Sequence, residues 1–258
     1  MGTDRYAYSS RLRRVNPLAK LAVMAVSAAV SLAAGSVAVS VFTFAVMCAL
    51  NVALGGTRPR ALTRMLRVPT GFLLIAVLTM AVGANARGEL LLGLRVGGAW
   101  YGVTAQSLLQ SLAVFAKAVS IVACVYFFTM TTPMTDFSRA LARLRVPRLF
   151  IELMDMIYRF IFVLSDTSAR IKTAQSARLG YRDARTSMRS TGTLASMVFV
   201  RAYRKSDRVY TALEARGYDG AIVTAAQSYE SGRHVLAFGA LVLCGQVAAL
   251  LFGVKYGY

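Results

Sequence analysis

The stretch PLAKLAVMAVSAAVSLAAGSVAVSVFTFAVMCALNVAL, residues 17–54, is apolar almost throughout, and Lys20 is its one charged residue. A helix of about 20 apolar residues crosses the hydrocarbon core of a bilayer. The stretch is therefore too long for one span and long enough for two. Gly35-Ser36 divides it and predicts a tight turn between spans over 17–34 and 37–54. This pattern places the chain among membrane proteins.

Three further apolar runs extend this interpretation. Spans are predicted over 68–86, 104–130 and 234–254, and the run over 104–130 contains Lys117. The composition agrees, since 57% of residues are hydrophobic and the mean hydropathy is +0.55, against about 45–50% apolar residues in soluble domains. The predicted fold class is an all-α membrane protein with about five transmembrane helices and a cytoplasmic coupling domain of long helices. Its expected parts are a four-span membrane domain (1–130), a cytoplasmic helical coupling domain (131–233) and a final transmembrane helix (234–258).

The charge is strongly basic, with 30 Lys and Arg against 11 Asp and Glu. The basic segments alternate with the predicted spans. Basic loops stay on the cytoplasmic side of a membrane, so this pattern indicates membrane topology and contact with lipid rather than binding to nucleic acid. Residues 1–20 contain five basic residues, and residues 55–67 contain four. Residues 131–233 contain 17 basic and 9 acidic residues. We expect a multi-pass protein of the cell membrane with its N-terminus and residues 131–233 in the cytoplasm. The tail 255–258 is then outside, although this short tail alone does not fix the orientation of the last span. The Gly-rich loop 87–101 is expected on the outer side, as a short interfacial hairpin.

Three helices are expected in the cytoplasmic region. Thr131-Thr132-Pro133 is a typical helix start and predicts a short helix ending near Arg145. Val146-Pro147 interrupts the chain and precedes a long helix over 147–179. A further helix is predicted over 193–216 from its apolar spacing.

The sequence lacks the residue sets of common catalytic sites. It has no phosphate-binding loop, because no Gly is followed by Lys, so hydrolysis of a nucleotide by this chain is not expected. His234 is the single histidine, and Cys48, Cys124 and Cys244 are far apart, so neither a metal site, a cofactor nor a catalytic residue is predicted. The acidic residues of the long helix are expected to pair with nearby arginines at helical spacing. They are Glu152, Asp155 and Asp166, with Arg159 and Arg170.

Two similar short segments end the long cytoplasmic helices. One contains Ala177-Arg178-Leu179-Gly180 and the other Ala215-Arg216-Gly217. Helix capping can explain each one, since Gly adopts the left-handed C′ conformation and Arg favours the negative end of the helix dipole. Capping does not explain why Ala precedes Arg in both. Two equivalent arginine tips also suit two acidic grooves, so both interpretations stay open.

The ordered motifs resemble the T component of energy-coupling-factor (ECF) transporters. The matching segments are NPLAK (16–20), TTP (131–133), RLRVPRLF (143–150), YRFIFVL (158–164), AQSARLG (174–180) and RVYTALEARGYDG (208–220). The segment 187–210 is most similar to the cobalt branch, the CbiQ-like proteins.

The resemblance implies a scaffold that couples two cytoplasmic ATP-binding cassette ATPases to a small membrane subunit that captures the substrate (the S component), either dedicated or shared. It implies that Arg178 and Arg216 reach acidic groups on the ATPases and that Ala177 and Ala215 allow close approach. The usual motif is Ala-Arg-Gly, whereas Leu occupies position 179 and Gly follows at 180. Either the helix continues one residue further or the first docking site differs from the second.

Other functions fit the sequence less well. A membrane enzyme acting on lipid would need paired Asp residues at a membrane face, and no such pair is found. A channel working alone would need polar residues in its spans, where Lys117 is the main charged residue. The substrate implied by the resemblance is cobalt, with nickel or a vitamin as alternatives.

Overall fold

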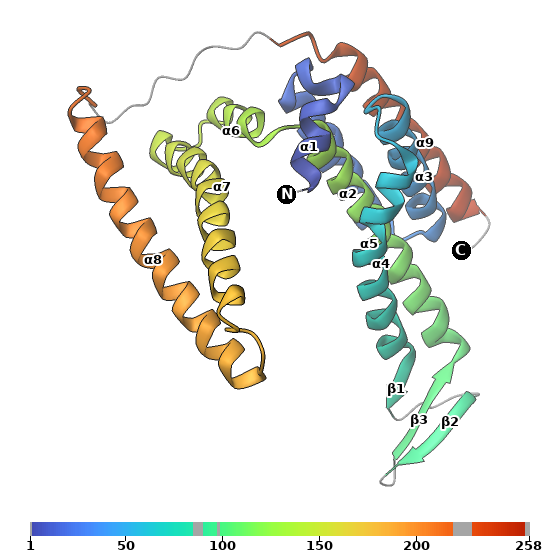
Figure 1. The fold of residues 1–258 in the computed structure, drawn as a ribbon. Helices are drawn as coiled ribbons and strands as arrows, with labels where there is room; N and C mark the ends of the chain where they lie inside the picture. Colours follow the sequence, from blue (N-terminus) through green and yellow to red (C-terminus); the bar gives the residue numbers. More distant parts are fainter. Residues whose placement is uncertain (1, 85–89, 97–98, 219–228, 256–258) are drawn as a thin grey trace. The chain divides into compact units, whose positions relative to one another are not determined.

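The computed structural model describes residues 2–84, 90–96, 99–218 and 229–255, and these form helices apart from one small sheet (Figure 1). The chain divides into two compact units. Unit 1 comprises residues 1–136 and 228–258, and unit 2 comprises 137–227.

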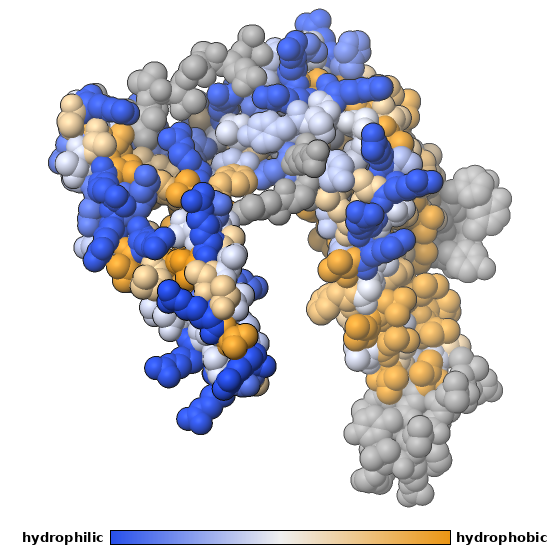
Figure 2. Space-filling view, in the orientation of Figure 1, coloured by the Kyte–Doolittle hydropathy of each residue, from blue (hydrophilic) through white to orange (hydrophobic). Residues whose placement is uncertain are grey.

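Unit 1 contains the apolar helices. Its helices are α1 (Gly2–Ser9), η1 (Arg11–Arg14), α2 (Pro17–Ala33), α3 (Val37–Ala53), α4 (Pro59–Ala81), α5 (Ala105–Thr131) and α9 (Arg233–Lys255). Among the residues that the structure describes, three segments are long and apolar enough to cross a membrane, namely α4, α5 and residues 233–251, while α2 and α3 are shorter apolar helices of 17 residues each. Figure 2 shows a broad apolar surface over α4 and α5. The predicted all-α membrane fold is confirmed.

Local sequence sets the ends of these helices. The Asn16 side chain accepts a hydrogen bond from the Leu18 N–H at 3.1 Å, and Pro17 occupies the first helical position of α2, where a missing N–H costs nothing. Gly35 has a φ of +66°, a conformation that glycine adopts readily. The predicted turn between α2 and α3 is therefore present.

The core of unit 1 lies where α2, α3, α5 and α9 meet. Its central side chains are buried and come from all four helices; they include Val23, Met47, Phe127 and Val242. Helices far apart in the sequence thus share one interior. The final span belongs to the same bundle as the first ones.

Two boundaries in unit 1 differ from the predictions. The loop expected over 55–67 is shorter, because α4 begins at Pro59 and carries Arg60, Arg64 and Arg67 on its first turns. Proline favours the first turn of a helix, and long basic side chains at a helix end can reach water. The span expected to reach residue 86 ends at Ala81, where β1 (Val82–Ala84) begins.

The expected hairpin near residues 87–101 is present as a three-stranded antiparallel sheet. Strands β2 (Leu90–Val96) and β3 (Ala99–Thr104) pair with each other, and β3 also pairs with β1. Residues 87–89 and 97–98 of the expected loop lie outside the described residues.

A buried lysine joins distant parts of unit 1. Lys20 is 0% exposed, and its Nζ donates to the carbonyl oxygens of Leu12 at 3.1 Å and Thr131 at 2.8 Å. The Asp136 carboxylate lies close enough to interact with this ammonium group and accepts a hydrogen bond from the Tyr229 hydroxyl at 2.9 Å. Thr131 is the last residue of α5, so its carbonyl oxygen has no N–H donor within that helix. The ammonium group of Lys20 provides the missing donor.

Unit 2 is built around two long helices. The boundary between the units falls within α6 (Met134–Arg143), and α7 (Arg148–Ala177) and α8 (Ala184–Glu214) follow as an antiparallel pair (Figure 1). The predicted start near Pro133 and the break at Pro147 are present. The third helix begins at Ala184, nine residues before the predicted start, and Gly192 lies inside it. A single glycine costs a helix only about 1 kcal/mol relative to alanine.

Unit 2 has little core of its own. No side chain of α7 or α8 is buried, although both helices are described over their full length. Large apolar side chains of α7 are exposed, among them Phe150, Leu153, Ile157 and Ile161. Helices normally bury such a stripe against a partner.

Candidate functional site

The end of α7 carries the first arginine tip. The Gly180 N–H donates to the Gln175 carbonyl at 2.8 Å, and the Leu179 N–H donates to the Ser176 carbonyl at 3.0 Å. Leu179 has a φ of +58°. These are the two hydrogen bonds and the left-handed residue of a Schellman motif, and they place Arg178 at the C-cap.

The end of α8 has the same arrangement. The Tyr218 N–H donates to the Leu213 carbonyl at 3.1 Å, the Gly217 N–H donates to the Glu214 carbonyl at 2.9 Å, and Gly217 has a φ of +72°. Arg216 therefore occupies the position that Arg178 has on α7.

The two ends share their terminal backbone hydrogen bonds and the position of the left-handed residue. Leu179 corresponds to Gly217, and an alanine precedes each arginine. The helices differ by one residue here, because α7 includes Ala177 whereas α8 ends at Glu214, before Ala215. The left-handed residue nevertheless follows the arginine directly at both ends. Leucine adopts the left-handed conformation here, which is uncommon for a residue with a Cβ atom.

Side chains hold the first tip in place. Gln175 accepts from the Tyr181 hydroxyl at 2.7 Å and donates to the Ser190 carbonyl at 3.0 Å, and the Ser190 hydroxyl donates to the Gly180 carbonyl at 2.7 Å. A Cβ atom on Gly180 would lie 2.8 Å from the Gln175 carbonyl oxygen and 2.9 Å from the Ser190 hydroxyl oxygen. Gly180 is therefore required by the close approach of the α7 backbone and of Ser190, while Leu179 provides the left-handed turn.

The second tip is tied to the other end of the helix pair. The Tyr218 hydroxyl donates to the Glu152 carboxylate at 3.0 Å, and Glu152 lies in the second turn of α7. At 1.5 Å per residue, Glu152 and Arg178 are about 40 Å apart along α7. The two arginine tips thus lie at opposite ends of the helix pair, and one small protein cannot readily contact both.

Both tips are accessible. Ala177, Arg178, Ala215 and Arg216 are exposed. Neither guanidinium group forms an ion pair or a side-chain hydrogen bond with a residue that the structure describes. Each arginine can therefore offer its planar set of donors to a carboxylate on another protein.

The acidic residues of α7 differ in their contacts, and Asp155 Oδ1 is buried without a hydrogen-bond partner among the described residues. The expected pair of Asp166 and Arg170 is present at 2.9 Å on an exposed surface, whereas Glu152 binds Tyr218. Within the described ranges, no cluster of three or more His, Cys, Asp or Glu residues could hold a metal ion.

Sequence reasoning missed the supporting residues Gln175, Tyr181 and Ser190. The sequence indicated this support only in part, because Gln175 and Gly180 both lie within the segment AQSARLG that resembles the family motif. Ser190 comes from the start of α8, and only the folded helix pair brings it to this site.

The equivalence of Leu179 and Gly217 leads to a prediction about stability. Gly217→Ala should destabilise unit 2 by about 1 kcal/mol, because a Cβ atom disfavours the left-handed conformation, and a Cβ here would meet no neighbouring atom. Leu179→Gly should cost nothing or stabilise slightly, since Leu179 is exposed and glycine removes the same strain. Thermal unfolding of the full chain in detergent measures both effects. Equal losses in the two variants would contradict this assignment of the left-handed positions.

Comparison with known proteins places these features in a family. A family profile described as cobalt transport protein, CbiQ, matches residues 8–228. The chain is 30% identical over 254 residues to a fused cobalt transport protein, CbiMQ, of Methanocorpusculum labreanum, covering 97% of this chain and 41% of that longer protein. It is 29% identical over 158 residues to the cobalt transport protein CbiQ of Salmonella typhimurium, covering 61% of this chain and 70% of the relative.

A more distant relative extends the relation to ECF transporters in general. The energy-coupling factor transporter transmembrane protein EcfT of Staphylococcus aureus is 27% identical over 202 residues, covering 73% of this chain and 72% of the relative. The profile match includes both arginine tips and the membrane helices α2 to α5. The chain therefore belongs to the CbiQ family of cobalt transport proteins, the CbiQ-like branch of the T components of ECF transporters.

Proposed function

We propose that this chain is the coupling subunit of an ECF-type importer for cobalt, linking two cytoplasmic ATPases to a membrane subunit that captures the substrate. The observation that carries the proposal is the pair of equivalent, exposed arginine tips, Arg178 and Arg216, at opposite ends of α7 and α8. Each tip contacts an acidic groove on one ATPase. Two copies of the same ATPase can present the same groove twice, and equivalent tips suit such a pair.

The alanine and glycine residues of the tips have a supporting role in this proposal. Ala177 and Ala215 are small and exposed, so an ATPase surface can approach the helix end closely. Leu179 and Gly217 provide the left-handed turns that follow the arginines, and Gly180 leaves room for the close backbone approach at the first tip.

The exposed apolar stripe on α7 suits the membrane side of the same function. Phe150, Leu153, Ile157 and Ile161 need an apolar partner, because unit 2 does not bury them. The substrate-capturing membrane subunit is that partner in our proposal. Movement of the ATPases then reaches it through the rigid helices α7 and α8.

Cobalt is the proposed substrate because the relatives CbiQ and CbiMQ are named as cobalt transport proteins. Nickel and a vitamin stay alternatives, since EcfT relatives carry no metal in their names. Uptake of radioactive cobalt and of radioactive nickel is measured in cells expressing the complete transporter. Uptake of cobalt alone supports the proposed substrate, uptake of nickel supports the first alternative, and uptake of neither metal leaves a vitamin.

The source of energy gives a direct test of the coupling function. The purified chain should not hydrolyse ATP, because its sequence has no phosphate-binding loop. Co-expressed with its ATPases, it should purify as a complex with two nucleotide-binding subunits that hydrolyse ATP. ATP turnover by the isolated chain, surviving removal of contaminants, would rule out a non-catalytic coupling role.

The orientation proposed for unit 2 is cytoplasmic. Ser187→Cys, in a chain whose Cys48, Cys124 and Cys244 are replaced by alanine, should resist a membrane-impermeant thiol reagent in intact cells. The same residue should react after permeabilisation. Reaction in intact cells would place unit 2 outside and would contradict contact with cytoplasmic ATPases.

A further inference from the structure

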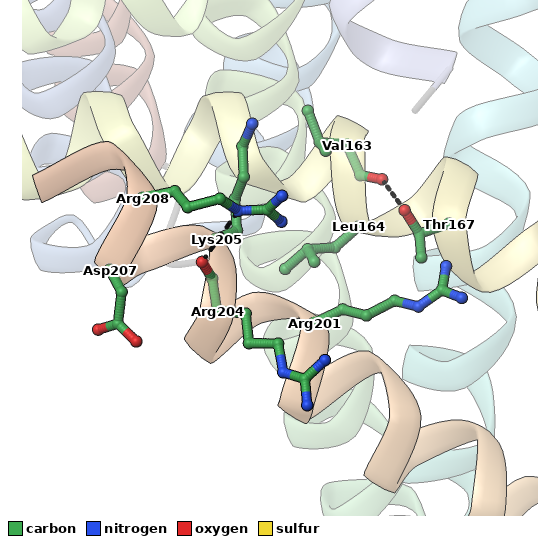
Figure 3. A pocket seen from close by; sticks show the side chains of 8 residues that line it. All are labelled: Val163, Leu164, Thr167, Arg201, Arg204, Lys205, Asp207 and Arg208. Carbon is green, nitrogen blue, oxygen red and sulfur yellow. Dashed lines mark hydrogen bonds between the residues drawn. The ribbon is translucent and has the colours of Figure 1, made fainter. Parts of the chain in front are cut away.

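A basic groove lies between α7 and α8, away from both arginine tips. It has a volume of about 720 Å³, which is within the range of sites for small ligands. Its lining residues come from the two facing helices: Val163, Leu164, Thr167, Arg201, Arg204, Lys205, Asp207 and Arg208. Figure 3 shows the Leu164 side chain between the cations of α8.

The charges of this groove are unbalanced. Four cations face one carboxylate, Asp207. The Arg208 Nε donates to the Arg204 carbonyl at 3.2 Å, but Arg201, Arg204 and Lys205 form no side-chain hydrogen bond or ion pair with a residue that the structure describes. Their donors are available, and a concave site with one sign of charge attracts an anion.

The apolar part of the groove indicates which kind of anion binds there. Leu164 and Val163 form its apolar wall. Leu164 is partly buried and Val163 is exposed. A ligand that pairs with the cations and also covers this wall has an anionic head and an apolar chain. A soluble anion would pair with the cations and leave Val163 in water.

We propose that this groove binds the phosphate headgroup of an acidic phospholipid, with an acyl chain against Val163 and Leu164. The chain spans a membrane, so phospholipids surround it. Clusters of four or more Lys and Arg on an amphipathic helix are typical of binding to acidic lipids. The site is separate from the proposed ATPase contacts, and its occupancy does not depend on them.

The test compares two variants that remove the same charge from the same helix. Arg201→Gln/Arg204→Gln alters the groove, and Arg185→Gln/Arg189→Gln removes two exposed arginines near the start of α8. The full chain is purified in micelles with equimolar phosphatidylglycerol and phosphatidylcholine, and native mass spectrometry counts the retained lipids. We expect the unaltered chain and the 185/189 variant to prefer phosphatidylglycerol, and the 201/204 variant to lose about tenfold of that preference.

Several results would overturn the proposal. They are no preference in the unaltered chain, equal losses in the two variants, or displacement of phosphatidylglycerol by excess inorganic phosphate. A 201/204 variant that keeps its lipid preference but loses the ATPases would show that the groove is a protein contact instead. If the double variant does not fold, Arg201→Glu and its control Arg185→Glu make the same comparison. Unchanged lipid preference in Arg201→Glu would then count against the site.

Discussion

Arg178→Ala/Arg216→Ala should abolish stable association with the ATPases and, with it, transport, while the chain still inserts and folds. Both arginines are exposed and unpaired among the described residues, so their removal leaves no buried charge within the chain. At an interface, truncation of one member of a desolvated charge pair costs roughly 2–5 kcal/mol. Each loss of 1.4 kcal/mol weakens binding about tenfold.

The alternative to docking is helix capping, and it predicts a different size of effect. An arginine near a helix C-terminus contributes about 0.3–1 kcal/mol through the dipole, which would leave assembly nearly normal. Arg185→Ala/Arg189→Ala is the matched control, since it removes the same charge from exposed positions of unit 2. Co-purification of ATPases with each variant, together with thermal unfolding of the chain, separates the two explanations.

The single substitutions refine this test. Because the two tips have the same backbone hydrogen bonds, Arg178→Ala and Arg216→Ala should weaken assembly to a similar extent. Arg216→Lys should restore only part of the binding, because lysine lacks the planar fork of donors that suits a carboxylate. A double alanine variant that retains both ATPases at the normal level would favour capping over docking.

Lys20→Met should strongly destabilise unit 1. The Nζ atom of Lys20 bonds to the Leu12 and Thr131 carbonyls, and the Asp136 carboxylate is nearby. Without the ammonium group, the Leu12 and Thr131 carbonyl oxygens lose this donor in the interior of the protein. Removing one partner of a buried ionic interaction costs about 3–5 kcal/mol, so the yield of folded protein and its thermal unfolding temperature should both fall.

Lys117→Met is the control for this prediction. Lys117 lies on α5 in the same unit and is partly exposed, and its ammonium group has no described ion pair or hydrogen bond. Its replacement should change stability little. Equal unfolding temperatures for Lys20→Met and Lys117→Met would show that the buried lysine does not stabilise the junction.

Much of the fold could be predicted because its signals are local. Apolar runs gave the membrane helices to within a few residues, and Gly35, Pro17, Pro133 and Pro147 marked turns and starts that the structure contains. The start of α4 was the largest error among the spans. There, a basic segment was taken for a loop, although basic side chains can also extend from the exposed end of a helix.

The sequence by itself determined the membrane class, the two long helices of unit 2 and the repeated Ala-Arg pairs at their ends. Tertiary structure decided how the first end is supported, because Ser190 of α8 bonds to Gln175 and to the Gly180 carbonyl on either side of Leu179, which has a conformation that leucine rarely adopts. It also gave Lys20 its role. In the sequence this residue is one basic group among five near the N-terminus, but its partner Thr131 is 111 residues away. Local patterns predict helices because they depend on near neighbours, whereas a buried charge depends on whichever groups folding brings to it.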